Sequence, residues 1–318
     1  MRIIGVSHRI VRWSIEARGA ARRWTEREAV LLAVHADGGA IGLGEAAPLP
    51  GMSIDSTGDA VAAAELLAAR LPAVIETPAH ASALADRITA APAARFAIET
   101  ALLAAYAQHA RTSVASLLAK RTPQAELASA IVVDDEAEAA AAVAAGARCL
   151  KIKVAGASTA VARARRIARA APVARLRIDP NRAWDADETI DALAALAELP
   201  IDFVEEPCAD AYRLLDAGAL PCRIALDESL IDLAPADLAH ALESPHLAAL
   251  MLKPTLLGGF QRCLALSALA HQHGVAPIVT HTLEGPIGFA ACHELARAVG
   301  ADVPVGLGRH PALRGAYR

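Results

Sequence analysis

The sequence predicts an α/β protein in which an N-terminal α+β module precedes a parallel β/α barrel. From residue 129 onward, short apolar runs alternate with alanine-rich segments, which is typical of repeated β/α units. Eight such runs fit a closed barrel, although an open doubly wound sheet would show the same local patterns. Before about residue 106 the order differs, because extended segments come first and helical ones follow.

The N-terminal module is expected to contain a small sheet and helices. Asp-Gly-Gly at 37–39 is a turn signal between two apolar segments, and residues 48–53 (PLPGMS) form a loop. Gly42-x-Gly44 superficially fits a dinucleotide-binding fingerprint, but prolines follow where its helix should begin, so we reject that reading. The expected strands are 2–11, 29–38 and 40–46, and the expected helices are 57–71 and 92–110.

The barrel strands are expected at the short apolar runs. The segments between them are long enough for helices, and residues 134–147 carry acids in the first turn, where the helix dipole favours them. The expected strands are 129–133, 149–154, 175–179, 202–207, 223–228, 247–254, 276–283 and 303–308.

Composition narrows the class of protein. The 318 residues are 55% hydrophobic and 21% charged, as in globular proteins. A net charge of −4 without a basic block argues against nucleic acid and anionic membranes as partners. No apolar run reaches the roughly 18 residues of a membrane span. Five dispersed cysteines without a C-x-x-C pair favour reduced thiols in a cytoplasmic protein.

Acidic side chains stand at the ends of three successive strands. Asp179, Glu205 and Asp227 end the third, fourth and fifth, and His281 near the end of the seventh could line the same mouth. The carboxyl ends of parallel strands meet at one rim, so the three carboxylates would repel one another without a cation. Oxygen ligands suit Mg²⁺ better than Zn²⁺ or Cu²⁺. The pattern predicts a magnesium site.

Lysine is rare in this chain, which has only Lys120, Lys151, Lys153 and Lys253. Lys151 and Lys153 point to one side of their strand, because residues i and i+2 share a face. Repulsion between them should lower their pKa, and nearby carboxylates or a metal would adjust it further. A lysine so placed can lose its proton and act as a base, whereas arginine cannot. We therefore expect Lys153 to be a base.

The motifs KIK, DPN, VEEP, DES and KP follow in this order, with 26 residues from Asp179 to Glu205 and 22 more to Asp227. In this the chain resembles the muconate-lactonizing subgroup of the enolase superfamily. GEAAPLPGMS, LRIDPNRAW and LKPTLLGG are most similar to the o-succinylbenzoate synthase family. The resemblance implies a modified (β/α) TIM-type barrel with an N-terminal α+β capping domain. The implied parts are a cap at 1–115, a barrel at 116–308 and a C-terminal tail at 309–318.

The resemblance also implies roles for individual residues. One divalent ion, Mg²⁺ with Mn²⁺ as a substitute, would be held by Asp179, Glu205 and Asp227. Lys153 would be the base, Lys253 the opposing lysine and Lys151 an electrostatic assistant. Pro180 is a departure, since alanine is more familiar there, and it removes one N–H. The residues expected near the substrate or behind the ligands are Arg177, Asn181, Glu228, Ser229, Glu284 and Gly285.

The implied activity is dehydration of a small-molecule carboxylate in the menaquinone pathway. An N-acylamino acid racemase or a dipeptide epimerase of the same subgroup is the main alternative. The Asp-x-Asp that dipeptide epimerases usually carry on the last strand is missing from VGLGRHP. A lactonizing enzyme, a Schiff-base aldolase using Lys151 or Lys253, and a non-catalytic barrel also stay open. The sequence does not determine the oligomeric state.

Overall fold

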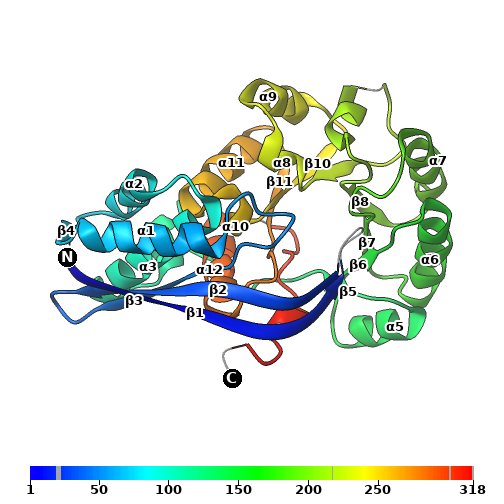
Figure 1. Ribbon diagram of the computed structural model, residues 1–318. Helices are drawn as coiled ribbons and strands as arrows, with labels where there is room; N and C mark the ends of the chain where they lie inside the picture. Colours follow the sequence, from blue (N-terminus) through cyan, green and yellow to red (C-terminus); the bar gives the residue numbers. More distant parts are fainter. Residues whose placement is uncertain (19–22, 217, 301, 317–318) are drawn as a thin grey trace.

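The computed structural model describes residues 1–18, 23–216, 218–300 and 302–316, and it contains two sheets (Figure 1). The first is a four-stranded antiparallel sheet in the order β3-β2-β1-β4. The second is a seven-stranded parallel sheet whose strands neighbour one another in chain order from β5 to β11. The predicted combination of an α+β module with a parallel β/α unit is confirmed.

The capping sheet is built around two long strands of 17 and 14 residues. Gly39 takes a φ of +81° in the turn between β2 and β3, a conformation that suits glycine. Helices of the same domain cover one face of this sheet (Figure 1). The strands are β1 (Arg2–Arg18), β2 (Arg23–Ala36), β3 (Ile41–Ala46) and β4 (Ala73–Val74), and the helices are α1 (Thr57–Ala69), α2 (Pro78–Ile88), α3 (Pro92–His109) and α4 (Val114–Leu118).

The Gly42-x-Gly44 pair of the rejected dinucleotide motif has a packing role. A Cβ on Gly42 would lie 1.8 Å from the carbonyl oxygen of Ala101, and one on Gly44 would lie 1.9 Å from that of Ala97. Both carbonyls belong to α3. The two glycines therefore allow α3 to approach β3 more closely than any side chain would permit.

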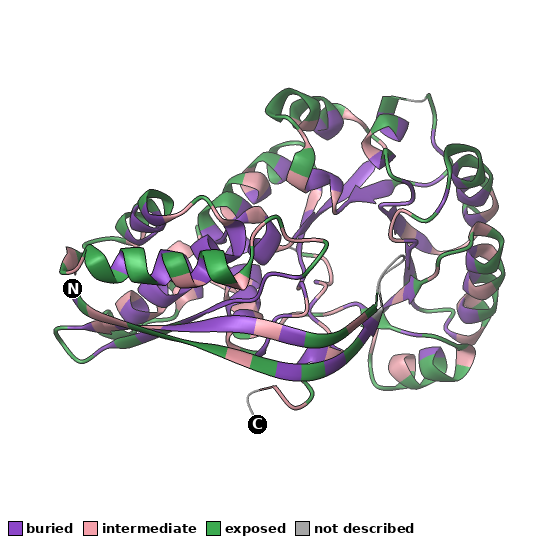
Figure 2. Ribbon diagram, in the orientation of Figure 1, coloured by how far each residue is buried: buried purple, intermediate pink, exposed green. Residues whose placement is uncertain are grey.

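The parallel sheet carries its helices on the outside. Buried residues concentrate on the strands, and the outward faces of the helices are exposed (Figure 2). The strands are β5 (Ile131–Val132), β6 (Cys149–Lys153), β7 (Arg175–Asp179), β8 (Ile201–Glu205), β9 (Ile224–Leu226), β10 (Leu247–Leu252) and β11 (Ala276–Val279). The helices are α5 (Glu136–Ala144), α6 (Ala157–Ala170), α7 (Ala186–Leu196), α8 (Ser229–Asp232), α9 (Pro235–Glu243), α10 (Pro254–Leu257), α11 (Phe260–Gln272) and α12 (Pro286–Val299), and η1 (Ala211–Asp216) and η2 (Pro311–Leu313) are short 3₁₀ helices.

The eighth predicted strand, 303–308, is not a regular strand. Val305 forms a single parallel bridge with Ser129, next to β5, and Gly306 forms one with Thr280, next to β11. These bridges join the two edges of the seven-stranded sheet. Pro304 lacks an N–H for a ladder, and glycine weakens a strand, so closure depends on isolated bridges.

The barrel interior is packed with side chains. Phe203, Ala225, Ala249, Met251 and Ile278 form a cluster inside the barrel, separate from the larger core between strands and helices. The barrel is therefore filled below its rim, and the carboxyl ends of the strands are the place where polar groups gather.

The two ends of the predicted barrel domain meet the cap. The proposed boundary at residue 115 falls inside α4, and no observation divides the chain there, so these limits stay a prediction. In the predicted tail, of which 317–318 lie outside the described residues, η2 packs on β1, and Nε1 of Trp13 donates to the carbonyl oxygen of Ala312 at 2.7 Å. None of the helices in the described ranges is long and apolar enough to span a bilayer.

Candidate active site

The predicted carboxylates and lysines lie at one rim of the barrel. β6 ends at Lys153 and β7 at Asp179, and these two residues pair in the parallel register. β8 ends at Glu205, Asp227 directly follows β9, and Lys253 directly follows β10. Because parallel strands present their carboxyl ends at the same edge, the strand order gathers these side chains.

Lys151 bridges two of the carboxylates. Its Nζ donates to both carboxylate oxygens of Glu205 at 2.8 Å and lies 2.8 Å from Oδ2 of Asp179. Burial alone would lower the pKa of Lys151, but the charges of Asp179 and Glu205 outweigh it and raise that pKa above its ordinary value. The expectation of a lowered pKa is therefore wrong for Lys151, because carboxylates from two other strands lie closer to it than the sequence pattern reveals.

Lys153 is held more loosely than the other rim lysines. Its side chain is 45% exposed, and its Nζ lies 3.4 Å from Oδ2 of Asp179. The side chains of Lys151 and Lys253 are mostly buried. Lys153 is therefore the rim lysine with the greatest access to an incoming substrate.

Lys253 is bound to carboxylates on the far side of the rim. Its Nζ contacts Oδ2 of Asp227 and lies 3.4 Å from Oε1 of Glu228. Burial alone would lower the pKa of Lys253, but Asp227 and Glu228 outweigh it and raise that pKa. A Schiff base requires a neutral amine, so these ion pairs also count against an aldolase that uses Lys151 or Lys253.

The carboxylates at the rim are unequally neutralised. Burial acts to raise the pKa of Asp179, but Lys151 and Lys153 outweigh it and hold that pKa below its usual range. Burial and the charge of Glu228 raise the pKa of Asp227 well above its usual range. Oδ1 of Asp227 and Oε2 of Glu228 are buried and have no hydrogen-bond partner among the described residues. The Asp227 side therefore has carboxylate oxygens that lack a full set of partners among the described residues.

The chemistry of these donors fits a hard divalent cation. All are carboxylate oxygens, and the two unpartnered oxygens could serve as ligands. In the described part of the chain, no three His, Cys, Asp or Glu side chains converge closely enough to hold a metal as they lie. The ammonium groups of Lys151 and Lys253 lie against the carboxylates instead. Magnesium at Asp179, Glu205 and Asp227 stays a prediction that requires these ammonium groups to give way.

The backbone is strained where the chain leaves β7 and β8. Asn181, Arg182 and Glu206 have φ values of +50°, +63° and +41°, which are unusual for residues other than glycine. Asn181 donates to Oδ1 of Asp179 from its backbone nitrogen at 3.0 Å and from Nδ2 at 2.8 Å. The strained turn therefore places Asn181 where it orients the carboxylate of Asp179.

Glu206 supports the rim from behind. It is buried, and burial raises its pKa. Its Oε2 accepts the backbone N–H of Asp227 at 2.7 Å, and its Oε1 accepts hydrogen bonds from Oγ of Ser229 and from Nε of Arg182, the latter at 3.1 Å. The predicted site residue Ser229 thus contacts Glu206, which in turn holds the backbone of Asp227.

Arg177 faces the barrel interior rather than the carboxylates. Its Nε donates to Oδ2 of Asp202 at 2.8 Å and its Nη1 to the carbonyl oxygen of Pro304 at 2.7 Å. The guanidinium carbon lies 4.7 Å from the ring centroid of Phe203. These contacts link β7, β8 and the closing segment, so the structure gives Arg177 a place in the packing of the barrel.

Glu284 and Gly285 lie at the contact between the barrel and the cap. Glu284 is fully buried and accepts hydrogen bonds from the hydroxyl of Thr255 and from the backbone N–H of Thr282 at 2.7 Å. The N–H of Gly285 donates to Oε1 of Glu45 in β3 at 2.5 Å. The structure does not bring these two predicted residues together with the rim lysines.

Arg27 is a buried residue that the sequence analysis missed. It donates to the carbonyl oxygens of Ala47 and Pro48 at 2.5 and 2.7 Å and to that of Leu283 at 3.0 Å. It thus ties the capping loop, residues 47–53, to the loop after β11. One feature of the sequence could have indicated that this charged residue is buried. Arg27 lies two residues before the apolar Ala29 in β2, so both side chains are on the same buried face of the strand.

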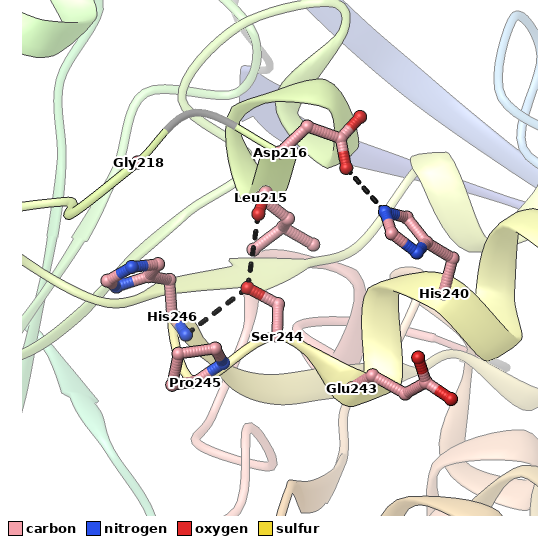
Figure 3. A pocket seen from close by; sticks show the side chains of 8 residues that line it. All are labelled: Leu215, Asp216, Gly218, His240, Glu243, Ser244, Pro245 and His246. Carbon is pink, nitrogen blue, oxygen red and sulfur yellow. Dashed lines mark hydrogen bonds and ion pairs between the residues drawn. The ribbon is translucent and has the colours of Figure 1, made fainter.

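A separate surface hollow of about 610 Å³ lies beside the beginnings of β9 and β10, at the opposite end of the barrel from the rim (Figure 3). Nε2 of His240 lies 2.6 Å from Oδ1 of Asp216, and Oγ of Ser244 donates to the carbonyl oxygen of Leu215 at 3.3 Å. None of the predicted site residues lines it. The lining residues are Leu215, Asp216, Gly218, His240, Glu243, Ser244, Pro245 and His246.

Two protein-family models match this chain, one in its N-terminal part and one in its C-terminal part. Residues 5–119 match the family model "Mandelate racemase / muconate lactonizing enzyme, N-terminal domain", and residues 134–310 match "Enolase C-terminal domain-like". The o-succinylbenzoate synthase of Haemophilus influenzae is 33% identical over 144 residues, 43% of this chain and 42% of that protein. That of Edwardsiella ictaluri is 35% identical over 146 residues, 43% of each. The matched stretch spans less than half the length of these relatives.

Solved structures match over nearly the whole chain. A dipeptide epimerase from Methylococcus capsulatus, complexed with Mg and the dipeptide L-Arg-D-Lys, has a TM-score of 0.85 and 26% identity, and the match covers 100% of this chain and 93% of that one. MenC from Desulfotalea psychrophila has a TM-score of 0.77 and 25% identity, with coverage of 98% and 94%. The fold, the order of the rim residues and a family model that matches more than half of the 318 residues together show that this chain belongs to the enolase superfamily.

Proposed function

We propose that this protein is a Mg²⁺-dependent o-succinylbenzoate synthase of menaquinone biosynthesis. It would dehydrate 2-succinyl-6-hydroxy-2,4-cyclohexadiene-1-carboxylate to 2-succinylbenzoate. The observation that carries the proposal is the contrast between an accessible Lys153 and a Lys253 held as an ammonium by Asp227 and Glu228. The relatives named o-succinylbenzoate synthase and the structural match to MenC support it.

In this proposal Lys153 removes the proton next to the ring carboxylate. The C–H bond breaks, and its electron pair moves into the conjugated carboxylate. The electron pair then returns to form a new double bond in the ring as the C–O bond of the hydroxyl group breaks, and the protonated Lys153 gives its proton to the leaving hydroxide, which departs as water. The ring becomes aromatic, which favours the second step, so no separate dedicated acid is required.

Lys253 and Lys151 have electrostatic roles in the same reaction. Asp227 and Glu228 raise the pKa of Lys253 despite its burial, so it stays cationic and can stabilise the flat, electron-rich ring from the face opposite Lys153. Before the ion binds, Lys151 holds Glu205 and Asp179 in position. A divalent ion bound by Asp179, Glu205 and Asp227 would supply a Lewis acid for the substrate carboxylate.

An N-acylamino acid racemase or dipeptide epimerase of the same subgroup is the second candidate. It is favoured by the structural match to the dipeptide epimerase of Methylococcus capsulatus. A racemase would use a lysine on each face of the α-carbon, and the rim supplies Lys153 and Lys253. Against an epimerase that holds a substrate ammonium, residues 303–310 (VPVGLGRH) contain no acid.

The two candidates are separated by one set of assays in D₂O. The protein with Mg²⁺ is incubated with the hydroxy-acid precursor and, separately, with N-succinylamino acids and dipeptides. We expect 2-succinylbenzoate to form from the precursor. Its formation is measured by ultraviolet absorbance. Rapid α-deuterium exchange into a dipeptide, with no dehydration of the precursor, would assign the protein to the epimerases instead.

A further inference from the structure

Two histidines form a stacked pair beside the rim. His281 lies just after β11, and His310 precedes η2. Their ring centroids are 4.0 Å apart with an angle of 22° between the ring planes. Phe289 of α12 presents its ring to both, with centroid distances of 5.9 Å to His281 and 4.9 Å to His310. The pair is thus held rigidly by three segments that meet at the closure of the barrel.

Both histidines keep a ring N–H without an acceptor among the described residues. Nδ1 of His281 accepts the backbone N–H of Leu283 at 3.2 Å, so in the neutral ring the proton is on Nε2, for which no described residue is an acceptor. His310 is only 6% exposed, yet neither of its ring nitrogens has a hydrogen-bond partner among the described residues. A buried donor without a partner costs free energy, so a purely packing role would favour phenylalanine at this position.

The surroundings keep both rings uncharged at neutral pH. Burial, the neighbouring His310 and the lysines Lys153, Lys151 and Lys253 lower the pKa of His281 well below its usual range. Burial and Arg27 lower the pKa of His310 to about 4. The pair therefore lies within the field of the rim lysines on one side and of Arg27, which holds the capping loop, on the other.

We propose that His281 and His310 together form the subsite for the second polar arm of the substrate, donating hydrogen bonds to its carbonyl or carboxylate oxygens. This inference rests on the proposed function, in which that arm is the succinyl group. Within 303–308, Gly306 and Gly308 offer no side chain that could satisfy the histidines in place of a ligand. The cationic surroundings favour an anionic arm over an ammonium group.

The test measures binding as well as turnover. Binding of 2-succinylbenzoate and of benzoate, which lacks the arm, is measured by calorimetry in the presence of Mg²⁺ with the full chain. His310→Phe keeps the stacked ring but removes both nitrogens. His281→Asn keeps an acceptor for the N–H of Leu283 but removes the Nε2 donor. His293→Phe is the matched control, because His293 packs on the same Phe289 with a centroid distance of 4.8 Å but does not belong to the pair.

We expect the native protein to bind 2-succinylbenzoate at least about tenfold more tightly than benzoate, consistent with a hydrogen bond to a charged group. His310→Phe and His281→Asn should each remove most of that preference and raise KM more than they lower kcat, while His293→Phe should leave both unchanged. An undiminished preference in His310→Phe, with the variant folded, overturns the subsite. So does a native protein with no preference. Absence of dehydration by the native protein overturns the proposed function instead. Dehydration is measured separately from binding, so the two failures can be told apart.

Discussion

Buried charges in the capping domain and at the barrel rim have different partners. In the cap, Glu99 accepts the backbone N–H groups of Phe260 and Gln261 at the start of α11, at 2.7 and 3.1 Å. Glu45 accepts the N–H groups of Gly285 and Gly288 at the start of α12, at 2.5 and 2.8 Å. Both carboxylates thus cap barrel helices, where the helix dipole favours negative charge.

At the rim the charged groups mainly contact one another. Lys151 contacts Asp179 and Glu205, and Lys253 contacts Asp227 and Glu228. A charge bound to fixed backbone groups cannot change partner without disturbing the fold. A lysine paired with a carboxylate can yield its place to a metal ion or a substrate. The comparison indicates that cap charges maintain the structure, whereas the rim charges are free to serve the chemistry of the proposed function.

The largest expected effect is that of removing the metal. Exhaustive chelation should abolish dehydration, because no Lewis acid would then stabilise the negative charge that develops on the substrate carboxylate. The thermal unfolding midpoint should change little, because Lys151 and Lys253 already neutralise much of the charge of the rim carboxylates. Activity and melting of chelated and Mg²⁺-restored samples check this. Full activity after chelation would contradict both the metal site and the division of roles.

Substitution of Lys153 should lower the activity of the protein without changing its stability against unfolding. Lys153→Ala should lower kcat by about 10²- to 10⁴-fold, the usual contribution of a positioned acid–base group. Lys153→Arg should be nearly as damaging, because arginine keeps the charge but cannot give up the proton. The denaturation midpoint should stay near native, since a half-exposed side chain with one ion pair at 3.4 Å contributes little. If the arginine variant keeps most of its rate, Lys153 is only an electrostatic residue.

Glu99 should show the opposite behaviour. Glu99→Ala leaves two backbone N–H groups at the start of α11 without their acceptor and removes one of the partners of the buried Arg95, at 3.3 Å, so unfolding should become easier by about 3–5 kcal/mol. The kcat per folded molecule should be unchanged. Urea titration with activity measured on the folded fraction checks both. Glu243→Ala, at an exposed position, is the control and should stay within about 0.5 kcal/mol of native. A large fall in kcat with normal stability would remove the distinction between cap and rim.

The smallest expected effect is on the pH dependence of stability at the junction of the two regions. The pKa of His310 is about 4 in the folded protein against an ordinary value of 6.5. Between these values the unfolded chain binds a proton that the folded chain does not, so this contribution is complete above pH 6.5 and is lost as the pH falls toward 4. Over the whole interval it amounts to on the order of 3 kcal/mol, of which a little over half is lost between pH 7 and pH 5. Thermal unfolding at pH 7 and pH 5 should show a smaller difference in His310→Phe than in the native protein, and an equal difference would contradict the neutral state of His310.

The strand ends of the barrel were predictable because the sequence pattern is local. Each apolar run is bounded by a polar residue, and β6, β7 and β8 end at Lys153, Asp179 and Glu205, as that pattern indicates. The eighth strand was not predicted correctly. Residues 303–308 are apolar, but they include Pro304 and two glycines, which disfavour a regular strand. In the described residues, isolated bridges therefore close the barrel.

The charge state of Lys151 could not be predicted from the sequence pattern. Lys151 and Lys153 are neighbours in the chain, so their repulsion is visible there, but the carboxylates that raise the pKa of Lys151 are contributed by residues 28 and 54 positions later. Glu45 and Gly285 are likewise 240 positions apart, and a buried glutamate in a strand carries no local sign of a helix that it will cap.

The sequence by itself therefore determined the order of strands and helices, the side of the barrel where acids and lysines gather, and the superfamily. The first two follow from hydrophobic periodicity and from the rule that parallel strands end at a common edge, whereas the superfamily follows from the resemblance of the motifs KIK, DPN, VEEP, DES and KP. Only the tertiary structure decided which lysine is loosely held, that Arg177 and Glu284 have partners other than the rim lysines and carboxylates, and that His281 stacks on His310. Each of those facts depends on distances between segments far apart in the chain, and electrostatic interactions and hydrogen bonds are set by such distances and by burial.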